Sequence, residues 1–262
     1  MTQTAYRAIF FDLDGTLLPL DMDAFMGGYF LSIESFVEEH GLDVVCFTAA
    51  LRSGIGAMAH NDGMRTNEEM FWRVFLDEIE SNTPKEVDWK SLLNEFYEKD
   101  FGEIGAGMPL NPLSSVVVET LKEKGYTLAL TTMPMFPACA VDWRLNWGDV
   151  DPAAFSRITT YENSSAIKPN TAYYEENLAA FDCKPEEVLM VGNNTREDLA
   201  CLKVGMPAYL ITDCLIDPDG FDLEAVDHGS MQEFFEFVCA LPDCDNPATC
   251  IAPAIGVVPL KG

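Results

Sequence analysis

After the segment "GAGMPLNPL", which covers residues 105–113, short apolar segments alternate with segments of helical periodicity. The expected strands are "AIFF" near the N-terminus and then "YTLALTT", "FSRITT", "EVLMVG" and "PAYLIT". The helices expected around the later strands cover residues 116–124, 171–181, 196–203 and 229–241. A strand that is apolar at successive positions is typical of a parallel sheet that is covered on both faces. The alternation therefore predicts an α/β fold in which helices cover both faces of a parallel sheet.

Between the first strand and this alternating region the sequence shows helical spacing alone. Apolar side chains recur three and four positions apart from about residue 21 to residue 101, and Thr66 with Glu69 fits a capping box at the start of a helix. We expect four helices here and therefore two domains: a core of residues 1–20 and 105–262, and an inserted all-α domain of residues 21–104. Phe71, Trp72 and Phe75 are expected to pack inside this insert rather than to contact a ligand.

The composition excludes several classes of partner. With 43 acidic and 16 basic residues the chain has a formal net charge of -27, so it repels nucleic acid and anionic membranes. For the same reason, a phosphate site in this protein needs positively charged groups fixed close to it. The first residues show no basic segment followed by an apolar one, and no apolar run approaches the roughly 20 residues of a membrane span. The eight cysteines include no Cys-x-x-Cys pair and no zinc pattern. We therefore expect a cytoplasmic protein, with monomer and dimer both left open.

Two aspartates follow the first strand with a single residue between them. Asp12 and Asp14 lie in "FFDLDGTLL", and two carboxylates so close raise each other's cost of ionisation unless a cation lies nearby. Groups that follow parallel strands collect at the carboxyl edge of the sheet. The polar groups expected to converge there are Asp12, Asp14, Thr132, Lys168, Asn193 and Asp198.

This set of side chains suits phosphoryl transfer. Carboxylate and amide oxygens from two loops make an octahedral magnesium site that water completes. One aspartate can attack phosphorus and a second can donate a proton to the leaving oxygen. A lysine, a hydroxyl group and the metal can together neutralise the phosphate.

Taken in order, the motifs resemble those of the haloacid dehalogenase superfamily. "FFDLDGTLL" resembles its first motif, "LALTTM" its second, "AIKPN" its third and "VLMVGNNTREDLACLKVGM" its fourth, and together they span residues 10–206. The helical insert between the first two motifs is similar to the C1 cap of this family. The resemblance implies a Rossmann-like core with a helical cap, and a hydrolase of the phosphatase branch.

The resemblance also implies a role for each residue. Asp12 would be the nucleophile and Asp14 the general acid and base, while Thr132 would hold a phosphoryl oxygen and Lys168 would neutralise the phosphate and steady Asp12. The implied ligands of the Mg2+ cofactor are Asp12, Asp14 (through its backbone carbonyl), Asn193 and Asp198. Members that cleave carbon–halogen bonds lack an acid at the position of Asp14, so its presence favours phosphate esters.

Two positions depart from the family pattern. Asn193 stands where the first aspartate of the fourth motif is usual, which removes a charge from the metal site, and Met133 stands where Asn or Gly is more usual. The leading hypothesis is a magnesium-dependent phosphatase that hydrolyses a small phosphorylated metabolite through an aspartyl-phosphate intermediate. A sugar phosphomutase of the same superfamily and a non-catalytic binding protein with this fold are the alternatives that the sequence leaves open.

Overall fold

The structure, a computed structural model, describes residues 6–82 and 87–252, and its centre is one six-stranded sheet. The strands lie in the order β3-β2-β1-β4-β5-β6, and every neighbouring pair is parallel. They are β1 (Ala8–Phe11), β2 (Thr127–Leu130), β3 (Arg157–Ile158), β4 (Val188–Gly192), β5 (Ala208–Ile211) and β6 (Asp227–Gly229). Because β2 and β4 flank β1 on opposite sides, the connections run in opposite directions from it. A ligand crevice is expected at such a point, outside the carboxyl ends of the strands.

Alternate side chains of β1 enter two separate apolar clusters. Ile9 and Phe11 pack with α5 (Pro112–Glu123) and α8 (Met231–Ala240) on one face of the sheet. Ala8 and Phe10 pack with α7 (Thr171–Ala180) on the other. All four side chains are at most 1% exposed, which explains why the strand is apolar at every position. The predicted fold class, a Rossmann-like parallel sheet with helices on both faces, is confirmed.

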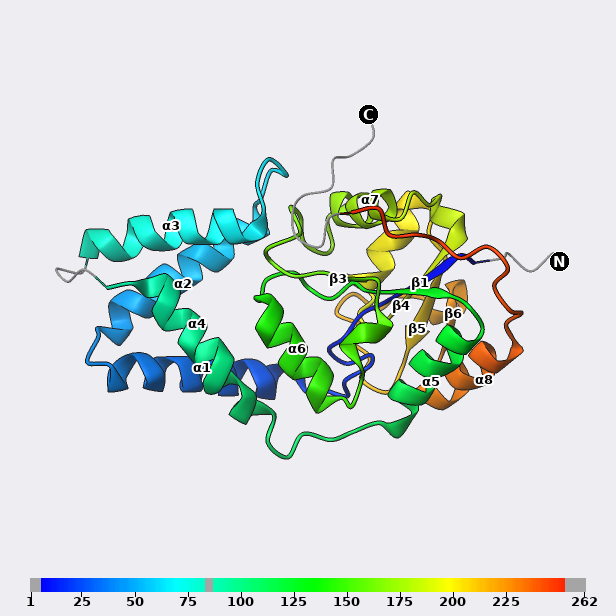
Figure 1. Ribbon diagram of the computed structural model, residues 1–262, viewed down its shortest axis with the longest axis horizontal. Coiled ribbons are helices and arrows are strands. Elements are labelled where there is room, and N and C mark those ends of the chain that lie inside the picture. The colour runs from blue at the N-terminus through cyan, green and yellow to red at the C-terminus, as the bar shows by residue number, and fades with distance from the viewer. Residues whose placement is uncertain (1–5, 83–86, 253–262) are drawn as a thin grey trace.

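Four helices follow β1 and lie together to one side of the sheet (left in Figure 1). They are α1 (Met22–Glu39), α2 (Val44–Ala59), α3 (Asn67–Asn82) and α4 (Trp89–Lys99). Asp21, Asp43 and Asp88 cap three of them by accepting backbone N–H groups, and Thr66 with Glu69 forms the predicted capping box of the fourth. No strand interrupts the described residues of this region, as predicted. The exact division into a cap of residues 21–104 and a core of residues 1–20 and 105–262 stays a prediction.

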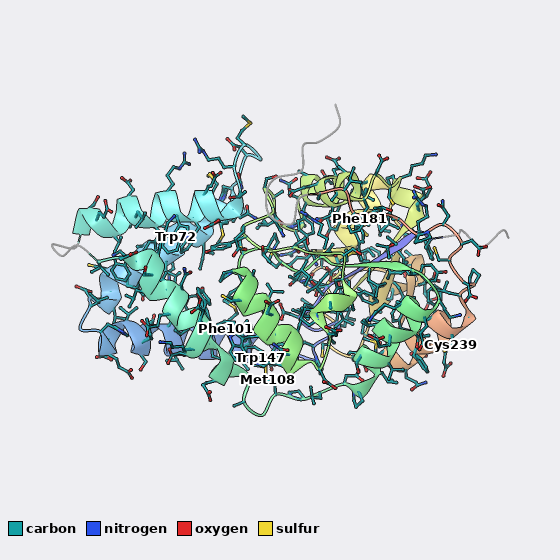
Figure 2. The ribbon with its side chains drawn as sticks, in the orientation of Figure 1. Trp72, Phe101, Met108, Trp147, Phe181 and Cys239 are labelled. Carbon is teal, nitrogen blue, oxygen red and sulfur yellow. The ribbon has the colours of Figure 1, made fainter. Side chains whose placement is uncertain are left out.

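Aromatic side chains fill the cap and its junction with the core. Phe71, Trp72 and Phe75 are at most 6% exposed, as expected of residues that pack inside the cap. Phe71 and Trp72 also line a cavity between the cap and the core, so the expectation that they contact no ligand stays a prediction. Figure 2 shows Trp72 among the cap helices, and Phe101 with Trp147 closer to the core. The rings of Phe101 and Trp147 stack with their centroids 5.5 Å apart, so the junction is a packed apolar contact.

Helix α6 (Ala138–Trp147) is the largest element that the sequence analysis missed. The sequence analysis placed no element between "YTLALTT" and "FSRITT", and Pro134 and Pro137 precede the helix. The helix contacts both α4 and the segment after it, and it lies between the cap and the sheet in Figure 1. Because apolar residues occur on several sides of such an enclosed helix, its sequence lacks the one-sided periodicity that marks a surface helix.

Smaller differences concern the ends of elements. The helix expected over residues 196–203 is a 3-10 helix over Asp198–Val204, and α5 begins at Pro112 rather than at residue 116. Strand β1 has the predicted bounds, β2 to β5 are shorter than predicted, and β6 was not predicted. Short 3-10 helices also occur at Phe101–Gly105, Pro152–Ala154, Pro185–Glu187 and Leu223–Ala225. Residues 1–5, on which the expectation of no leader segment rests, and the last ten residues lie outside the described ranges. None of the described helices has the length and apolar character needed to cross a bilayer.

Asn67, the first residue of α3, joins the cap to two loops of the core. Its side-chain amide donates to the carbonyl oxygens of Pro134, at 3.0 Å, and Ala166, at 3.2 Å. Its backbone N–H donates to the carbonyl of Ser164 at 2.8 Å. The residue is fully buried. These two loops carry Thr132 and Lys168, so one cap residue links the second and third motifs.

Replacing Asn67 with alanine should lower the free energy of unfolding by about 2–4 kcal/mol, because two buried carbonyl groups lose their donor. Urea unfolding followed by circular dichroism measures this loss. The matched control is Asn94→Ala, since Asn94 is an exposed asparagine of α4, and it should change stability by less than about 0.5 kcal/mol. Equal effects of the two substitutions would contradict the proposed link.

Candidate active site

The carboxyl ends of β1 and β4 form the wall of a pocket of about 220 Å³. The backbone holds these ends together, since the N–H of Asp12 donates to the carbonyl of Val191 at 2.8 Å. The polar side chains in the pocket wall are those of Asp12, Asp14, Arg144, Asn193, Asn194 and Glu197, and the apolar ones are those of Met22, Phe25, Met26, Met133, Met135, Phe136 and Ile216. The pocket lies where the strand order predicts a ligand crevice.

Lys168 lies between two aspartates from different strand ends. Its Nζ atom is 2.7 Å from Oδ1 of Asp12 and 2.6 Å from Oδ1 of Asp198. The other oxygen of Asp198, Oδ2, accepts the backbone N–H groups of Asn193 and Asn194, both at 2.9 Å. Gly192 is required for this approach, because a Cβ atom there would lie 2.2 Å from the carboxyl carbon of Asp198. Both oxygens of Asp198 are therefore engaged by the protein.

For both Asp12 and Lys168, burial shifts the pKa in one direction and the oppositely charged neighbour shifts it in the other. Burial is the largest influence on Asp12 and raises the pKa of its carboxyl group, an effect that Asp198 and Asp14 reinforce and the Lys168 ammonium opposes. Burial would lower the pKa of Lys168, but the carboxylates of Asp12 and Asp198 outweigh it and hold that pKa well above its usual value. Lys168 therefore stays charged, and it limits the rise in the pKa of Asp12, which burial still raises to about 8.

Thr16 links Asp12 to Asn193. Its hydroxyl group is 3.4 Å from Oδ2 of Asp12 and 3.2 Å from Oδ1 of Asn193. The amide nitrogen of Asn193 donates to the carbonyl of Cys214 at 2.6 Å, which turns Oδ1 toward the pocket. Gly15 has a φ of +84°, and a Cβ atom there would lie 2.1 Å from Nδ2 of Asn193, so the turn after Asp14 needs glycine.

Asp14 forms a buried ion pair that the sequence analysis did not predict. Nη1 of Arg144, on α6, donates to Oδ2 of Asp14, and the Arg144 side chain is 1% exposed. The guanidinium group also lies over the ring of Phe136, 4.8 Å from its centre. Oδ1 of Asp14 and Nη2 of Arg144 are buried without a hydrogen-bond partner among the described residues. Burial raises the pKa of Asp14 and Arg144 opposes that rise.

Thr132 is held by its backbone while its hydroxyl group stays unpaired. The Thr132 carbonyl accepts the hydroxyl groups of Tyr173, at 2.8 Å, and Thr159, at 2.9 Å. Its Oγ1 atom is buried and has no partner in the described part of the chain. Thr132 does not line the pocket, although its neighbour Met133 does. An unpaired buried hydroxyl is expensive unless a ligand completes it.

The structure thus brings five of the six predicted residues together. Asp12, Lys168 and Asp198 are in direct contact, and Asp14 and Asn193 line the same pocket. The roles assigned to all six stay predictions. Arg144, Thr16 and Glu197 are site residues that the sequence analysis missed. The available signal for Arg144 was a single arginine among the mostly apolar residues of "ACAVDWRLNW".

The donor atoms at this edge suit a hard cation such as magnesium. Oδ2 of Asp12 and Oδ1 of Asn193 both lie near Thr16, and oxygen donors of this kind are the ones that magnesium prefers. Within residues 6–82 and 87–252, no group of three or more His, Cys, Asp or Glu side chains is arranged to hold a metal. A metal here would therefore use a mixed set in which an amide oxygen takes part.

A family model matches most of the chain. The model of haloacid dehalogenase-like hydrolases covers residues 6–205. The chain belongs to this family. The four motifs and their spacing are thus those of a HAD-like hydrolase.

Two curated proteins match shorter parts of this HAD-like hydrolase. A glyceraldehyde 3-phosphate phosphatase of Methanothermobacter thermautotrophicus is 33% identical over 81 residues, which is 28% of this chain and 36% of that protein. The pyrophosphatase PpaX of Anoxybacillus flavithermus is 34% identical over 83 residues, 32% of this chain and 37% of that protein. The matched region thus spans little more than a third of each relative's length.

The fold is shared with solved structures at low sequence identity. A 2-haloacid dehalogenase of Pseudomonas syringae pv. tomato superimposes with a TM-score of 0.61 at 17% identity, over 90% of this chain and 98% of that one. Likeness at this identity concerns the fold. The chemistry of this HAD-like hydrolase has to be argued from its own side chains.

Replacing Lys168 with methionine removes the cation between two buried carboxylates. We expect a loss of about 3–5 kcal/mol in the free energy of unfolding at pH 8 and a smaller loss at pH 5. Without the ammonium group, the pKa of Asp12 in the folded protein should rise further above its value in the unfolded chain. The folded protein then loses stability as the pH rises from the unfolded-state pKa to the folded-state pKa, so the loss is larger at pH 8. Urea unfolding at both pH values measures this.

The control for this prediction is Lys99→Met. The Lys99 side chain is 67% exposed beside Glu95, so its replacement should change stability by less than about 1 kcal/mol at either pH. An equal loss at pH 5 and pH 8 in Lys168→Met would show that Lys168 does not set the ionisation of Asp12.

Replacing Arg144 with methionine should destabilise the protein by about 3–5 kcal/mol, because the Asp14 carboxylate is left buried without its cation. Adding Asp14→Asn should restore much of that loss, since a neutral amide needs no counter-ion. Thermal and urea unfolding of the two single variants and the double variant measure the coupling. Arg52→Met, at an exposed position of α2, is the control. A double variant as unstable as Arg144→Met would refute the electrostatic account.

Proposed function

We propose that the protein is a Mg2+-dependent phosphatase that hydrolyses a small phosphorylated metabolite through an aspartyl-phosphate intermediate. The observation that carries the proposal is that Asp14 lies in the same pocket wall as Asp12 and keeps one carboxylate oxygen unpaired. Ester cleavage needs a proton donor beside the nucleophile, and members of this family that displace halide lack an acid at this position. The two curated relatives are both named as phosphatases.

The first step transfers the phosphoryl group to Asp12. Its carboxylate attacks phosphorus while the bond to the ester oxygen breaks, and Asp14 donates its proton to that oxygen, which leaves as an alcohol. We retain Thr132 as a hydrogen-bond donor to a phosphoryl oxygen because its hydroxyl group is buried and unpaired, although the residue does not line the pocket. Lys168 would offset the negative charge of the phosphoryl group. In the second step Asp14 takes a proton from water, the resulting hydroxide attacks phosphorus, and inorganic phosphate leaves Asp12 free again.

Asp12, Asn193 and the backbone carbonyl of Asp14 would hold the magnesium ion. When bound, the ion supplies positive charge to the phosphoryl oxygens. We give Asp198 a supporting role, because its carboxylate already engages Lys168 and two backbone N–H groups. Asn193 contributes an oxygen without a charge, so we expect weaker magnesium binding than in a site with an aspartate there.

Hydrolysis of p-nitrophenyl phosphate with and without magnesium tests the proposal. Asp12→Asn should lose at least about a thousandfold in kcat, because no nucleophile remains. Asp14→Asn should lose about 10²–10⁴-fold in kcat on an alkyl phosphate. The nitrophenyl ester, whose leaving group needs no proton, should still release nitrophenol rapidly in the first turnover, while hydrolysis of the aspartyl-phosphate stays slow because Asp14 no longer takes the proton from water. Asp23→Asn, at an exposed position of α1, is the control for both.

Four results would overturn this function. Full activity in Asp12→Asn or indifference to chelation would remove the mechanism. Isomer formation from a sugar phosphate without release of inorganic phosphate would support a phosphomutase. Neither magnesium binding by calorimetry nor turnover would support a binding protein that has kept the fold.

A further inference from the structure

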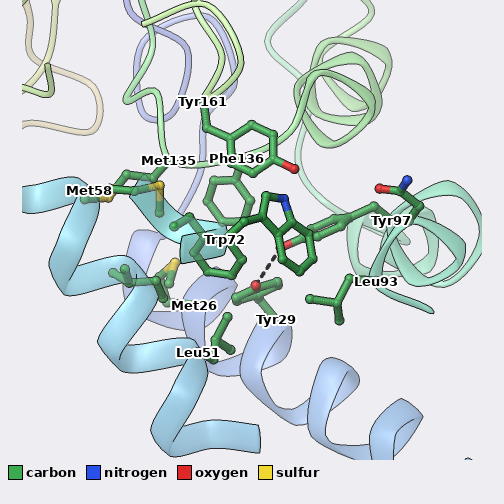
Figure 3. Close-up of a pocket in the computed structure, with 13 residues that line it drawn as sticks. Met26, Tyr29, Leu51, Met58, Trp72, Leu93, Tyr97, Met135, Phe136 and Tyr161 are labelled. Carbon is green, nitrogen blue, oxygen red and sulfur yellow. Dashed lines mark hydrogen bonds between the residues drawn. The ribbon is translucent and has the colours of Figure 1, made fainter. Parts of the chain in front are cut away.

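A second cavity, of about 80 Å³, lies between the cap helices and the core. Residues of α1, α2, α3 and α4 make most of its lining, and Met135, Phe136 and Tyr161 of the core complete it. Figure 3 shows these side chains turned toward one another around the cavity. We call it the cap chamber. Protein interiors contain few voids larger than a water molecule, so a cavity of this size at the cap–core junction needs an explanation.

The lining of the cap chamber is mainly apolar, and its side-chain polar groups are the hydroxyl groups of Tyr29, Tyr97 and Tyr161, the indole N–H of Trp72 and the amide of Asn94. None of the described residues that line it is charged. The hydroxyl groups of Tyr29 and Tyr97 are hydrogen-bonded to each other at 2.8 Å, the dashed line in Figure 3. Asn94 brings the single side-chain amide of the lining, and it is an exposed residue. An occupant with several hydroxyl groups would lose its hydrogen bonds to water there, whereas an apolar occupant loses none.

The cap chamber shares a wall with the catalytic pocket. Met26, Met135 and Phe136 line both cavities. Methionine side chains are unbranched and adapt their shape to what they contact, so two of the three shared residues can shift to join the cavities. Phe136 also lies under the guanidinium group of Arg144, which holds Asp14. Phe136 thus connects the chamber lining, through Arg144, to Asp14.

We propose that the substrate is the phosphate ester of an apolar alcohol, and that its branched alkyl or aromatic group occupies the cap chamber while the phosphate lies at Asp12. This inference rests on the proposed phosphatase function and adds the class of substrate. It also counts against a sugar phosphomutase, because a sugar would place its hydroxyl groups against an apolar lining that leaves them unpaired.

A pair of substrates with similar leaving groups tests the proposal. 3-Methylbutyl phosphate and glycerol 3-phosphate are both esters of primary alcohols, so they differ mainly in what the cap chamber must hold. We expect kcat/KM to be at least about tenfold higher for 3-methylbutyl phosphate. Equal values, or a preference for glycerol 3-phosphate, would overturn the proposal.

Two matched variants of α2 show whether the chamber causes this preference. Ile55 lines the chamber, and Ile55→Phe should fill it, so that the preference falls to about threefold or less. Val45, on the same helix, is 80% exposed, and Val45→Phe should leave both substrates unaffected. Circular dichroism establishes that each variant is folded. A folded Ile55→Phe variant with an unchanged preference would overturn the proposal.

Binding without catalysis separates this inference from the proposed function. With ¹³C-methyl methionine labels, 3-methylbutanol should shift the signals of Met26, Met58 and Met135 in a saturable way, and Ile55→Phe should abolish these shifts. Met64, which is 82% exposed, is the internal control. If no ester is hydrolysed but these shifts occur, the phosphatase function fails and the apolar site stands. If the lining signals stay in place, or Met64 shifts equally, the apolar site fails.

Discussion

The ammonium group of Lys168 holds the carboxyl edge of the sheet together. It joins Asp12, 156 positions earlier in the chain, to Asp198, 30 positions later. Asp198 in turn receives the backbone N–H groups of the loop after β4. Three segments that are distant in sequence are thereby fixed around one buried charge, and the sheet order places them side by side. Without that charge, the pKa of Asp12, which burial already raises, would rise further.

The charge balance of the site differs from that of the whole chain. The chain is strongly acidic, with a net charge of -27, yet the three buried carboxylates at the site face two buried cations, Lys168 and Arg144. With Glu197, a partly buried residue of the pocket wall, two formal negative charges remain. Asn193 and Arg144 both make the site less negative. Asn193 has an uncharged amide where a carboxylate is usual, and Arg144 adds a positive charge. A phosphate therefore approaches a pocket much closer to neutrality than the surrounding surface.

The sequence predicted what is local and missed what depends on tertiary packing. Five of the six strands, the cap helices and the four motifs were found because apolar runs, capping residues and the Asp-x-Asp-Gly turn carry their own signals, whereas the short, partly exposed strand β6 was missed. Helix α6 was missed because two prolines precede it and its enclosed position hides the periodicity. Arg144 was missed with it, since an arginine gains meaning at this site only once α6 is placed beside Asp14. The cap chamber had no signal either, because its lining comes from elements that meet only in the folded chain.

Asn67 has a consequence for how such a protein can acquire new specificity. Its side-chain amide connects the first turn of α3 by hydrogen bonds to the loops that carry Thr132 and Lys168. Most of the chamber lining comes from other positions on the cap helices. Substitutions in that lining can therefore accumulate without disturbing the catalytic loops. A cap transplanted from a relative would need an equivalent of this asparagine, or the recipient loops would lose their support.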